Sequence, residues 1–210
     1  METRERAASR ELTVLGCPTN IRAQAWKRNR GHGKVLLGLG ANCPGPWGTP
    51  AKTLHRALRE LEQRGITVEV ISDLFETAAM GAARQPPYVN QVALLTTSLP
   101  APALLRLLKQ IEARGGRRAG RPWGMRTLDL DIIDYKGLKM NWSRGKKGMP
   151  RERIRPLVLP HPQLEQRPFV LKPLLDIAPN WCHPVLKLSA SELWRRLPNR
   201  GQGSVMKQAP

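Results

Sequence analysis

The pattern of apolar and polar positions after residue 33 predicts a strand, a helix and a second strand in succession. Residues 34–40 (KVLLGLG) are mostly apolar and end in glycine, which is typical of a buried strand. A helix is expected after Thr49 and Pro50, because threonine caps helix starts and proline fits the first turn. Its apolar side chains recur at helical spacing before Gly65, and they are Leu54, Ala57, Leu58 and Leu61. Residues 66–71 (ITVEVI) then alternate, as a strand with one buried face requires.

The same kinds of pattern continue towards the end of the chain. Residues 88–98 and 127–135 predict two more strands. A second helix is expected to begin at Pro102 and to end at a pair of glycines. Two short helices are expected at 168–178 and 189–197. Since single helices are separated by pairs of strands, the order predicts an α+β sandwich of the split βαβ kind.

The length of 210 residues suits one compact domain with tails. We expect the folded domain at 34–200, a basic disordered extension at 1–33 and a flexible tail at 201–210. A basic loop insertion is expected at about 138–155, which is rich in lysine and arginine. The formal net charge of +19 is concentrated in the extension, in this insertion and in the arginine-rich segment 114–126.

A strongly basic chain favours partners that carry phosphate, such as a small phosphorylated ligand, a nucleic acid or an anionic membrane. The three cysteines, at 17, 43 and 182, are widely spaced and form no C-x-x-C pair, so neither a disulfide framework nor a thiolate zinc site is expected. No apolar run approaches the roughly 18 residues of a spanning helix, and no secretory signal is evident. We therefore expect a cytoplasmic protein with no membrane partner.

The most informative local pattern is T-L-D-L-D-I at residues 127–132. Asp129 and Asp131 are two positions apart on a predicted strand, so both carboxylates project from one face while their neighbours point into the core. Such a pair suits Mg²⁺, which binds one or two carboxylates and completes its shell with water and substrate phosphates. Two plainer interpretations stay open at this point: a solvated strand face for the acids, and an RNA-binding loop for the arginines upstream.

The arginines near this acidic pair change its interpretation. Arg126 lies three residues before the pair, and Arg117, Arg118 and Arg121 lie on the glycine-rich segment upstream. Phosphoryl or pyrophosphoryl transfer needs cations on the transferring oxygens and an aligned nucleophile, and this combination provides the cations. No P-loop motif is present, and G-L-G-A-N-C from Gly38 breaks G-x-G-x-x-G at its last position. A bound nucleotide must therefore be held in some other way.

Five motifs follow one another between about residues 34 and 181. They are G-L-G-A-N (38–42), F-E-T-A-A-M-G (75–81), Q-P-P-Y-V-N (85–90), W-G-M-R-T-L-D-L-D-I (123–132) and L-P-H-P-Q-L-E-Q-R-P-F-V-L (159–171). In this order they resemble the 6-hydroxymethyl-7,8-dihydropterin pyrophosphokinase family of folate biosynthesis. The resemblance implies a ferredoxin-like α+β core, with a mostly antiparallel sheet and helices on both faces. It also implies transfer of pyrophosphate from ATP to the pterin hydroxymethyl group, with AMP as co-product and two Mg²⁺ ions.

Matched motif by motif, the resemblance implies roles around the phosphates. Asp129 and Asp131 resemble the ligands of both Mg²⁺ ions. The residues that it implies in catalysis are Arg117, Arg126 and His161. The residues that it implies in ATP binding are Lys109, Glu112, Arg118, Ile132 and Arg167. The second arginine of the loop is either Arg118 or Arg121.

The resemblance also implies a pterin site. A flat bicyclic ring with amide groups needs aromatic faces above and below it and fixed polar groups at its edge. Phe169 and Tyr88 resemble the stacking pair, and Asn90 resembles the residue that reads the edge. Trp123 resembles the loop residue that closes over the ring. The other positions that match the pterin border are Asn42, Thr77 and Met80.

Two other functions compete with this interpretation. A basic nucleic-acid-binding module would bind polyanions with a steep salt dependence and would not respond to Mg²⁺-ATP. A family member that binds pterin without catalysis is disfavoured, because the acidic pair, Arg126 and His161 are all present. We therefore expect a monomeric enzyme whose partners are ATP and hydroxymethyl-dihydropterin, and no nucleic acid partner.

Overall fold

A computed structural model describes residues 33–78, 85–118, 124–142, 156–198 and 206–207. The predicted extension, except its last residue, lies outside these ranges, and so does most of the predicted basic insertion and of the predicted tail. In the part of the chain that is described, no helix has the length and apolar character needed to cross a bilayer.

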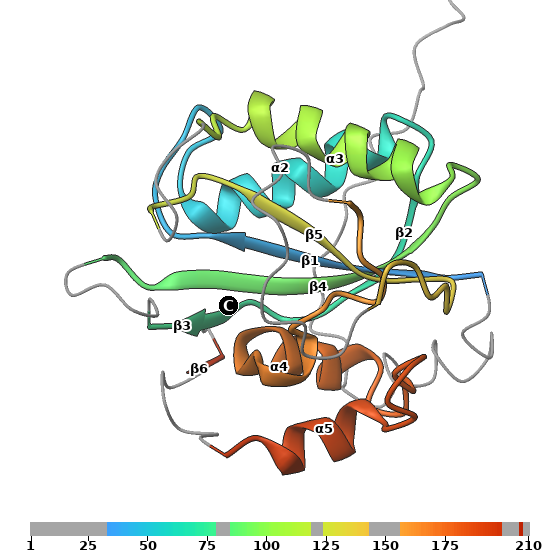
Figure 1. Ribbon diagram of the computed structural model, residues 1–210. Helices are drawn as coiled ribbons and strands as arrows, with labels where there is room; N and C mark the ends of the chain where they lie inside the picture. Colours follow the sequence, from blue (N-terminus) through green and yellow to red (C-terminus); the bar gives the residue numbers. More distant parts are fainter. Residues whose placement is uncertain (1–32, 79–84, 119–123, 143–155, 199–205, 208–210) are drawn as a thin grey trace, which may run out of the picture.

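A sheet of six strands forms the centre of the protein (Figure 1). The strands are β1 (Val35–Ala41), β2 (Thr67–Ile71), β3 (Phe75–Thr77), β4 (Tyr88–Thr96), β5 (Asp129–Tyr135) and β6 (Met206–Lys207). β1 lies between β4 and β5, β2 and β3 both pair with β4, and β6 pairs with β3. These pairings are all antiparallel, which confirms the predicted sheet.

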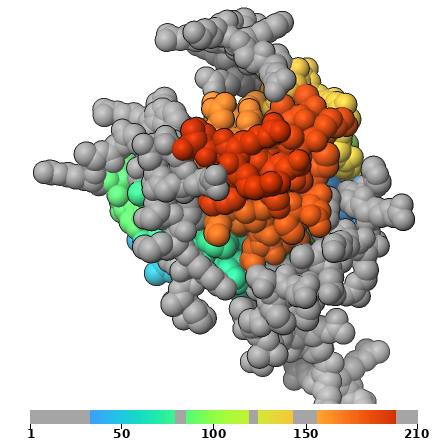
Figure 2. All heavy atoms as spheres, turned by 90° about the horizontal axis from the view of Figure 1, so that it is seen from below, coloured from blue at the N-terminus to red at the C-terminus, as the bar shows by residue number. Residues whose placement is uncertain are grey.

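Helices cover both faces of the sheet (Figure 1). They are α2 (Pro50–Glu62), α3 (Ala101–Arg114), α4 (Pro168–Ile177) and α5 (Ala190–Arg196), with the short 3-10 helix η1 (Leu164–Gln166) before α4. α2 and α3 lie on one face, α4 lies on the other, and α5 packs on the outer side of α4. From that side, the C-terminal segment forms a broad surface over the molecule (Figure 2). The predicted sandwich with helices on both faces is therefore confirmed.

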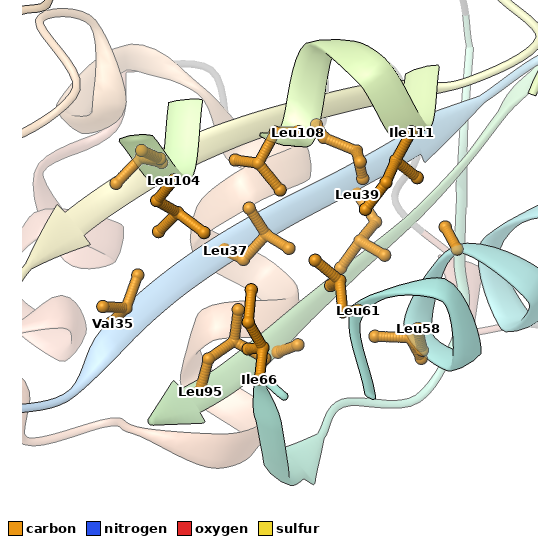
Figure 3. Close-up of a cluster of buried hydrophobic side chains, with 14 of the residues drawn as sticks. Val35, Leu37, Leu39, Leu58, Leu61, Ile66, Leu95, Leu104, Leu108 and Ile111 are labelled. Carbon is orange, nitrogen blue, oxygen red and sulfur yellow. The ribbon is translucent and has the colours of Figure 1, made fainter. Parts of the chain in front are cut away.

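Two apolar cores hold the layers together. β1 contributes to both, since Leu37 faces α2 and α3 whereas Leu36 faces α4. In the first core, leucines of β1 meet Leu58 of α2 and Leu108 of α3 (Figure 3). The second core includes Trp181, which is 1% exposed. Removing these apolar faces from water is the main favourable contribution to folding, and it fixes β1, β4 and β5 as a rigid platform.

The helix boundaries follow local chemistry. The Thr49 side chain accepts a hydrogen bond from the backbone of the first turn of α2, and Pro50 is the first residue of that helix. Gly65 follows with a φ of 74°, a conformation that glycine adopts without steric cost. Ser189 caps α5 through a capping box with Glu192. The predicted starts of both helices are confirmed.

Three strands show why the structure differs from the sequence-based expectation. β3 was not predicted, because three residues are too few to show an alternating pattern, and its pairing with β4 defines it. β5 begins at Asp129, two residues after the predicted start. β6 lies inside the tail that was predicted to be flexible, where Met206 and Lys207 pair with Glu76 and Phe75. In all three cases, the extent of the strand depends on pairing with another segment and not on the local sequence pattern.

Candidate active site

A cavity of about 350 Å³ opens on the face of the sheet that α4 covers. Its walls come from β1, β3, β4 and β5 and from the segment that leads from β5 into α4. Its lining includes nine of the predicted site residues: Thr77, Tyr88, Asn90, Arg126, Asp129, Asp131, His161, Arg167 and Phe169. The fold thus brings residues expected at phosphate and residues expected at pterin into one space.

Asp129 and Asp131 occupy alternate positions of β5, with the buried Leu130 between them pointing to the opposite side. Across the ladder, Asp129 lies opposite Gly40 and Asp131 lies opposite Gly38 of β1. The two glycines also line the cavity. Because glycine has no side chain, the space beside both carboxylates stays open for a ligand.

Arginines surround the acidic pair. Arg117 and Arg126 each place an Nη1 atom near the same oxygen of Asp129, at 2.5 Å and 2.8 Å. Arg167 Nη1 lies 3.9 Å from Asp131 Oδ2. Burial opposes the charge of Arg117, but the carboxylates of Asp129 and Glu112 outweigh it and raise the pKa of Arg117. The site therefore presents positive charge beside two carboxylates, an arrangement suited to polyphosphate.

Arg126 is oriented by its main chain. Its N–H donates to Asn42 Oδ1 at 2.7 Å, and its carbonyl accepts from the Asn42 N–H at 2.9 Å. The Asn42 amide also donates to Gln85 Oε1 and to the Pro86 carbonyl, both at 3.3 Å. Asn42 stays a predicted contact of the pterin, and in the structure its side chain joins the end of β1 to the segments that precede β4 and β5.

Glu112 is almost fully buried beneath the acidic pair, with 1% of its surface exposed. Its Oε1 accepts from the Leu130 N–H at 2.7 Å and from Lys109 Nζ at 2.9 Å, and it also contacts Arg117. Burial raises the pKa of Glu112, although the Lys109 charge and the Leu130 N–H favour its ionised form. Glu112 and Lys109 were predicted to bind ATP, but neither lines the cavity.

Two further residues predicted at ATP also lie away from the cavity walls. The Ile132 side chain is 4% exposed and packs in the core beneath α2 and α3. Arg118 is exposed at the end of the described part of its loop. Neither is among the residues that line the cavity. Arg121 and the predicted pterin residues Met80 and Trp123 lie outside the described residues.

His161 is held in one orientation at the cavity wall. Its main-chain N–H donates to the Ile133 carbonyl of β5 at 2.9 Å, and its ring Nδ1 accepts from the Gln163 main-chain N–H at 3.3 Å. Burial, followed by the nearby Arg167 charge, lowers the pKa of His161. A neutral imidazole whose Nδ1 accepts carries its proton on Nε2, so His161 is a hydrogen-bond donor at neutral pH.

Away from the acidic pair, the cavity is lined by polar and aromatic side chains. Asn90 is 6% exposed, and its amide donates to Thr77 Oγ1 at 2.9 Å, which fixes the orientation of the amide. The Tyr88 hydroxyl donates to the Gly124 carbonyl at 3.2 Å. Phe169 stands at the start of α4 with the Arg167 guanidinium 5.7 Å from its ring centroid. Flat rings with a fixed amide beside them suit a planar heterocycle.

Four glutamines line the cavity that were not predicted as site residues, and they are Gln85, Gln91, Gln163 and Gln166. Gln163 Oε1 accepts from Arg167 Nη2 at 2.7 Å and so orients that guanidinium. Gln85, Gln163 and Gln166 lie inside the motifs quoted from the sequence, and Gln91 directly follows one of them. Their presence in those motifs was the available signal, but the contact with Arg167 depends on the turn at η1.

The donors present fit magnesium better than a transition metal. Within the described ranges, no group of three or more His, Cys, Asp or Glu side chains is arranged to hold a metal ion. Two carboxylates beside open space are nevertheless what Mg²⁺ uses when water and substrate phosphates supply its other ligands. The chemistry of this donor set therefore fits Mg²⁺ bound together with a nucleotide.

Comparisons with known proteins agree with this geometry. The model of the family described as 7,8-dihydro-6-hydroxymethylpterin-pyrophosphokinase (HPPK) matches residues 36–179, more than half of the chain. The 2-amino-4-hydroxy-6-hydroxymethyldihydropteridine pyrophosphokinase of Synechocystis sp. is 40% identical over 154 residues, which cover 73% of this chain and 70% of the relative. The protein of that name from Aquifex aeolicus is 34% identical, over 75% of this chain and 88% of the relative.

Solved structures give the same fold. Plasmodium falciparum HPPK-DHPS with STZ-DHP aligns with a TM-score of 0.56 at 17% identity, over 78% of this chain and 41% of that protein. The wild-type protein with pteroate gives a TM-score of 0.58 at 15% identity, over 78% of this chain and 44% of that protein. This chain spans less than half of those proteins, and the likeness supports the ferredoxin-like fold alone. From the family match and the relatives, this chain belongs to the 7,8-dihydro-6-hydroxymethylpterin-pyrophosphokinase family.

Proposed function

We propose that this protein transfers a pyrophosphoryl group from ATP to the hydroxymethyl group of 6-hydroxymethyl-7,8-dihydropterin, in folate biosynthesis. The pterin hydroxyl oxygen forms a bond to the β-phosphorus of ATP. The bond from that phosphorus to the oxygen that bridges it to the α-phosphorus breaks. The products are AMP, which keeps the bridging oxygen, and the pterin diphosphate, and the hydroxyl proton is released. The single observation that carries this proposal is that the carboxylate pair and the aromatic and amide groups share one cavity.

Asp129 and Asp131 are the residues proposed to hold two Mg²⁺ ions. Bound there, the ions would neutralise charge on the ATP phosphates and fix the geometry of the triphosphate. Support comes from the alternate spacing on β5 and from the glycines opposite both carboxylates. Aspartates on a paired strand move little, so the phosphate end of the cavity is preorganised.

The proposed roles of the cationic residues follow from their positions. Arg126, whose main chain is tied to Asn42, provides a fixed positive charge beside the transferring phosphates. Arg117 lies at the base of a loop and provides a second charge that can move between anionic partners. His161 donates a hydrogen bond from Nε2 to a phosphate oxygen, because its Nδ1 is already an acceptor. These contacts stabilise charge that develops as the phosphorus–oxygen bond breaks.

For the pterin, we propose that Phe169 and Tyr88 contact the faces of the ring and that Asn90 binds its polar edge. Asn90 is suited to this role because its amide is held by Thr77 before any ligand arrives. Preorganised polar groups cost little ordering entropy on binding. Trp123 and Met80, outside the described residues, stay predicted contacts of the same ring, and Asn42 is proposed to support the site through Arg126.

Product analysis tests the proposal. Purified protein is incubated with Mg²⁺, ATP and 6-hydroxymethyl-7,8-dihydropterin, and the nucleotides are separated by ion-exchange chromatography. We expect AMP and pterin diphosphate in equal amounts, dependent on Mg²⁺. Formation of ADP, or no nucleotide conversion by a protein that circular dichroism shows to be folded, would reject the proposal. A monomeric state and a cytoplasmic location also stay predictions, and size-exclusion chromatography with light scattering tests the first.

A further inference from the structure

The two carboxylates proposed to bind metal differ in their contacts with guanidinium groups and in their exposure to solvent. Two guanidinium nitrogens contact Asp129 Oδ1, from Arg117 at 2.5 Å and from Arg126 at 2.8 Å. For Asp131, the nearest described guanidinium nitrogen is that of Arg167, at 3.9 Å. The Asp129 side chain is 25% exposed and that of Asp131 is 42% exposed. One of the two proposed ligands therefore already holds positive charge that the protein itself supplies.

The two arginines on Asp129 are held differently. The main chain of Arg126 forms hydrogen bonds with Asn42 in both directions, at 2.7 Å and 2.9 Å, so its backbone is fixed to the end of β1. Arg117 follows the end of α3, and its Nη1 contacts a second carboxylate, that of Glu112. Arg117 is therefore the guanidinium that can leave Asp129 and still keep an anionic partner.

Glu112 is built to stay in place when Arg117 moves. Its carboxylate is 2% exposed and accepts a hydrogen bond at 2.7 Å from Leu130, the residue between the two aspartates. A buried carboxylate needs a cationic partner, because a lone charge away from water is costly. Lys109, at 2.9 Å, supplies one cation, and Arg117 is the other. Glu112 thus remains bound to β5 whichever way the Arg117 side chain turns.

We propose that Arg117 is an internal counterion of Asp129 in the nucleotide-free protein, and that Glu112 is a positioning residue that retains Arg117 when Asp129 binds a divalent cation. This inference rests on the proposed function, since it assumes Mg²⁺ and ATP as ligands. A divalent cation and the Arg117 guanidinium repel each other, so they compete for the same carboxylate oxygen. ATP phosphates offer Arg117 a new anionic partner. Cation and nucleotide therefore favour each other's binding, with Arg117 as the link.

The test measures binding of Mn²⁺, a paramagnetic substitute for Mg²⁺, to the whole protein by electron paramagnetic resonance without nucleotide. Arg117→Gln is expected to raise the Mn²⁺ affinity about 3- to 10-fold, because one competing charge is removed. Arg114→Gln is the matched control, since it removes the same charge from the end of α3. The Nη1 atom of Arg114 lies 3.4 Å from Glu60 Oε2 and not beside Asp129. The control is expected to change the affinity less than about 2-fold. Equal affinities for Arg117→Gln and wild type, or equal rises in both variants, would overturn the proposal.

A second arm measures the role of Glu112. Glu112→Gln keeps an oxygen for the Leu130 N–H but leaves Arg117 only Asp129, so the nucleotide-free Mn²⁺ affinity is expected to fall about 3-fold. Adding Arg117→Gln to this variant is expected to cancel the fall, which a general loosening of the fold would not do. A double variant that binds Mn²⁺ as weakly as Glu112→Gln would contradict the positioning role. If Glu112→Gln fails to fold in a thermal melt, the Arg117 arm decides alone.

The same experiment separates this inference from the proposed function. Mn²⁺ binding is repeated with a non-hydrolysable ATP analogue. If wild type binds no Mn²⁺ even then, or if Asp131→Asn binds it as well as wild type, the metal site itself is misplaced. If wild type binds Mn²⁺ with the analogue and Asp131→Asn does not, the site stands. In that case, the Mn²⁺ affinity of Arg117→Gln is compared with and without the analogue. If the ratio of these two affinities equals the ratio for wild type, only the counterion proposal is contradicted.

Discussion

Gly40 of β1 lies directly between Asn90 of β4 and Asp129 of β5 in the antiparallel ladders. A Cβ atom added at Gly40 would lie 3.3 Å from Asn90 Oδ1. Asn90 and Asp129 both line the cavity, on the proposed pterin side and the proposed phosphate side. The absence of a side chain at Gly40 therefore lets the two halves of the site share one space.

Substitution of this glycine tests that relationship. Gly40→Ala is expected to displace the Asn90 amide and to raise the KM for the pterin about 10-fold, because small displacements of positioned groups have large kinetic effects. The melting temperature should change little, since β1 is an extended strand that accepts an alanine. Steady-state kinetics with each substrate varied in turn provide the measurement. Unchanged constants for both substrates would mean that Gly40 does not border the bound ligands.

The metal-binding role proposed for Asp131 gives a second prediction. Asp131→Asn keeps the size of the side chain and removes the charge, so turnover is expected to fall by about 100-fold or more. Its side chain is 42% exposed, and the free energy of unfolding should change by no more than about 0.5 kcal/mol. Glu62→Gln, at the exposed end of α2, is the control for loss of one acidic charge. Near-normal turnover of Asp131→Asn would show that this carboxylate is not a metal ligand.

A buried acid outside the cavity should matter for stability and not for activity. Glu60 of α2 is 1% exposed, and its carboxylate accepts from Arg56 at 2.9 Å and from Arg64 at 2.6 Å. Glu60→Gln leaves these guanidinium groups without their charged partner, and we expect the free energy of unfolding to fall by about 1–3 kcal/mol. Urea denaturation measures this change, with Glu62→Gln again as the control. A large loss of turnover in a folded Glu60→Gln protein would contradict the assignment of α2 to the scaffold.

Acid sensitivity is predicted from a buried histidine. His183 is fully buried, and its Nδ1 accepts from the N–H groups of Val185 and Leu186 at 3.2 Å and 3.1 Å. Burial lowers the pKa of His183 to about 4. The unfolded chain therefore binds a proton near pH 6.5 that the folded chain does not. The stabilisation from neutral His183 is present above that pH and is lost as the pH falls towards 4, by up to about 3 kcal/mol.

The His183→Asn variant isolates this contribution. An asparagine oxygen can accept from the same turn, but it does not titrate. We expect the free energy of unfolding of wild type to fall more steeply than that of the variant between pH 7.5 and pH 5, as measured by urea denaturation. Other acids titrate equally in both proteins, so the difference reports His183. Parallel pH profiles would show that the histidine does not control acid stability.

Much of the fold was predictable because local signals and long-range packing agree. The Thr49 and Pro50 start of α2 holds in the structure, since the apolar face that the pattern marks is the buried one. The alternation of residues 66–71 holds only in part, because a register shift between Val68 and Val70 places Val68 against the first core and Val70 against the second. β3 and β6 were not predictable in this way. Each is defined by its partner strand, and three or two residues carry no periodic signal.

The residues that form the candidate site were easier to predict than the contacts that these residues make. The spacing of Asp129 and Asp131 already places them on one face of a strand. The burial of Glu112 under that strand depends on how α3 packs against β5, which no local pattern encodes. The same holds for Asn42, whose side chain meets the main chain of Arg126 across 84 positions of sequence.

The central claim is that the two aspartates of β5 hold metal ions and ATP phosphates beside a pterin ring. A crystal structure of the protein with Mn²⁺, a non-hydrolysable ATP analogue and 6-hydroxymethyl-7,8-dihydropterin tests it most directly, because manganese gives an anomalous signal. We predict anomalous peaks in contact with Asp129 and Asp131, phosphates of the analogue on those peaks, and the pterin ring against Phe169. Both ligands bound in the crystal with no anomalous peak at either carboxylate would contradict the account.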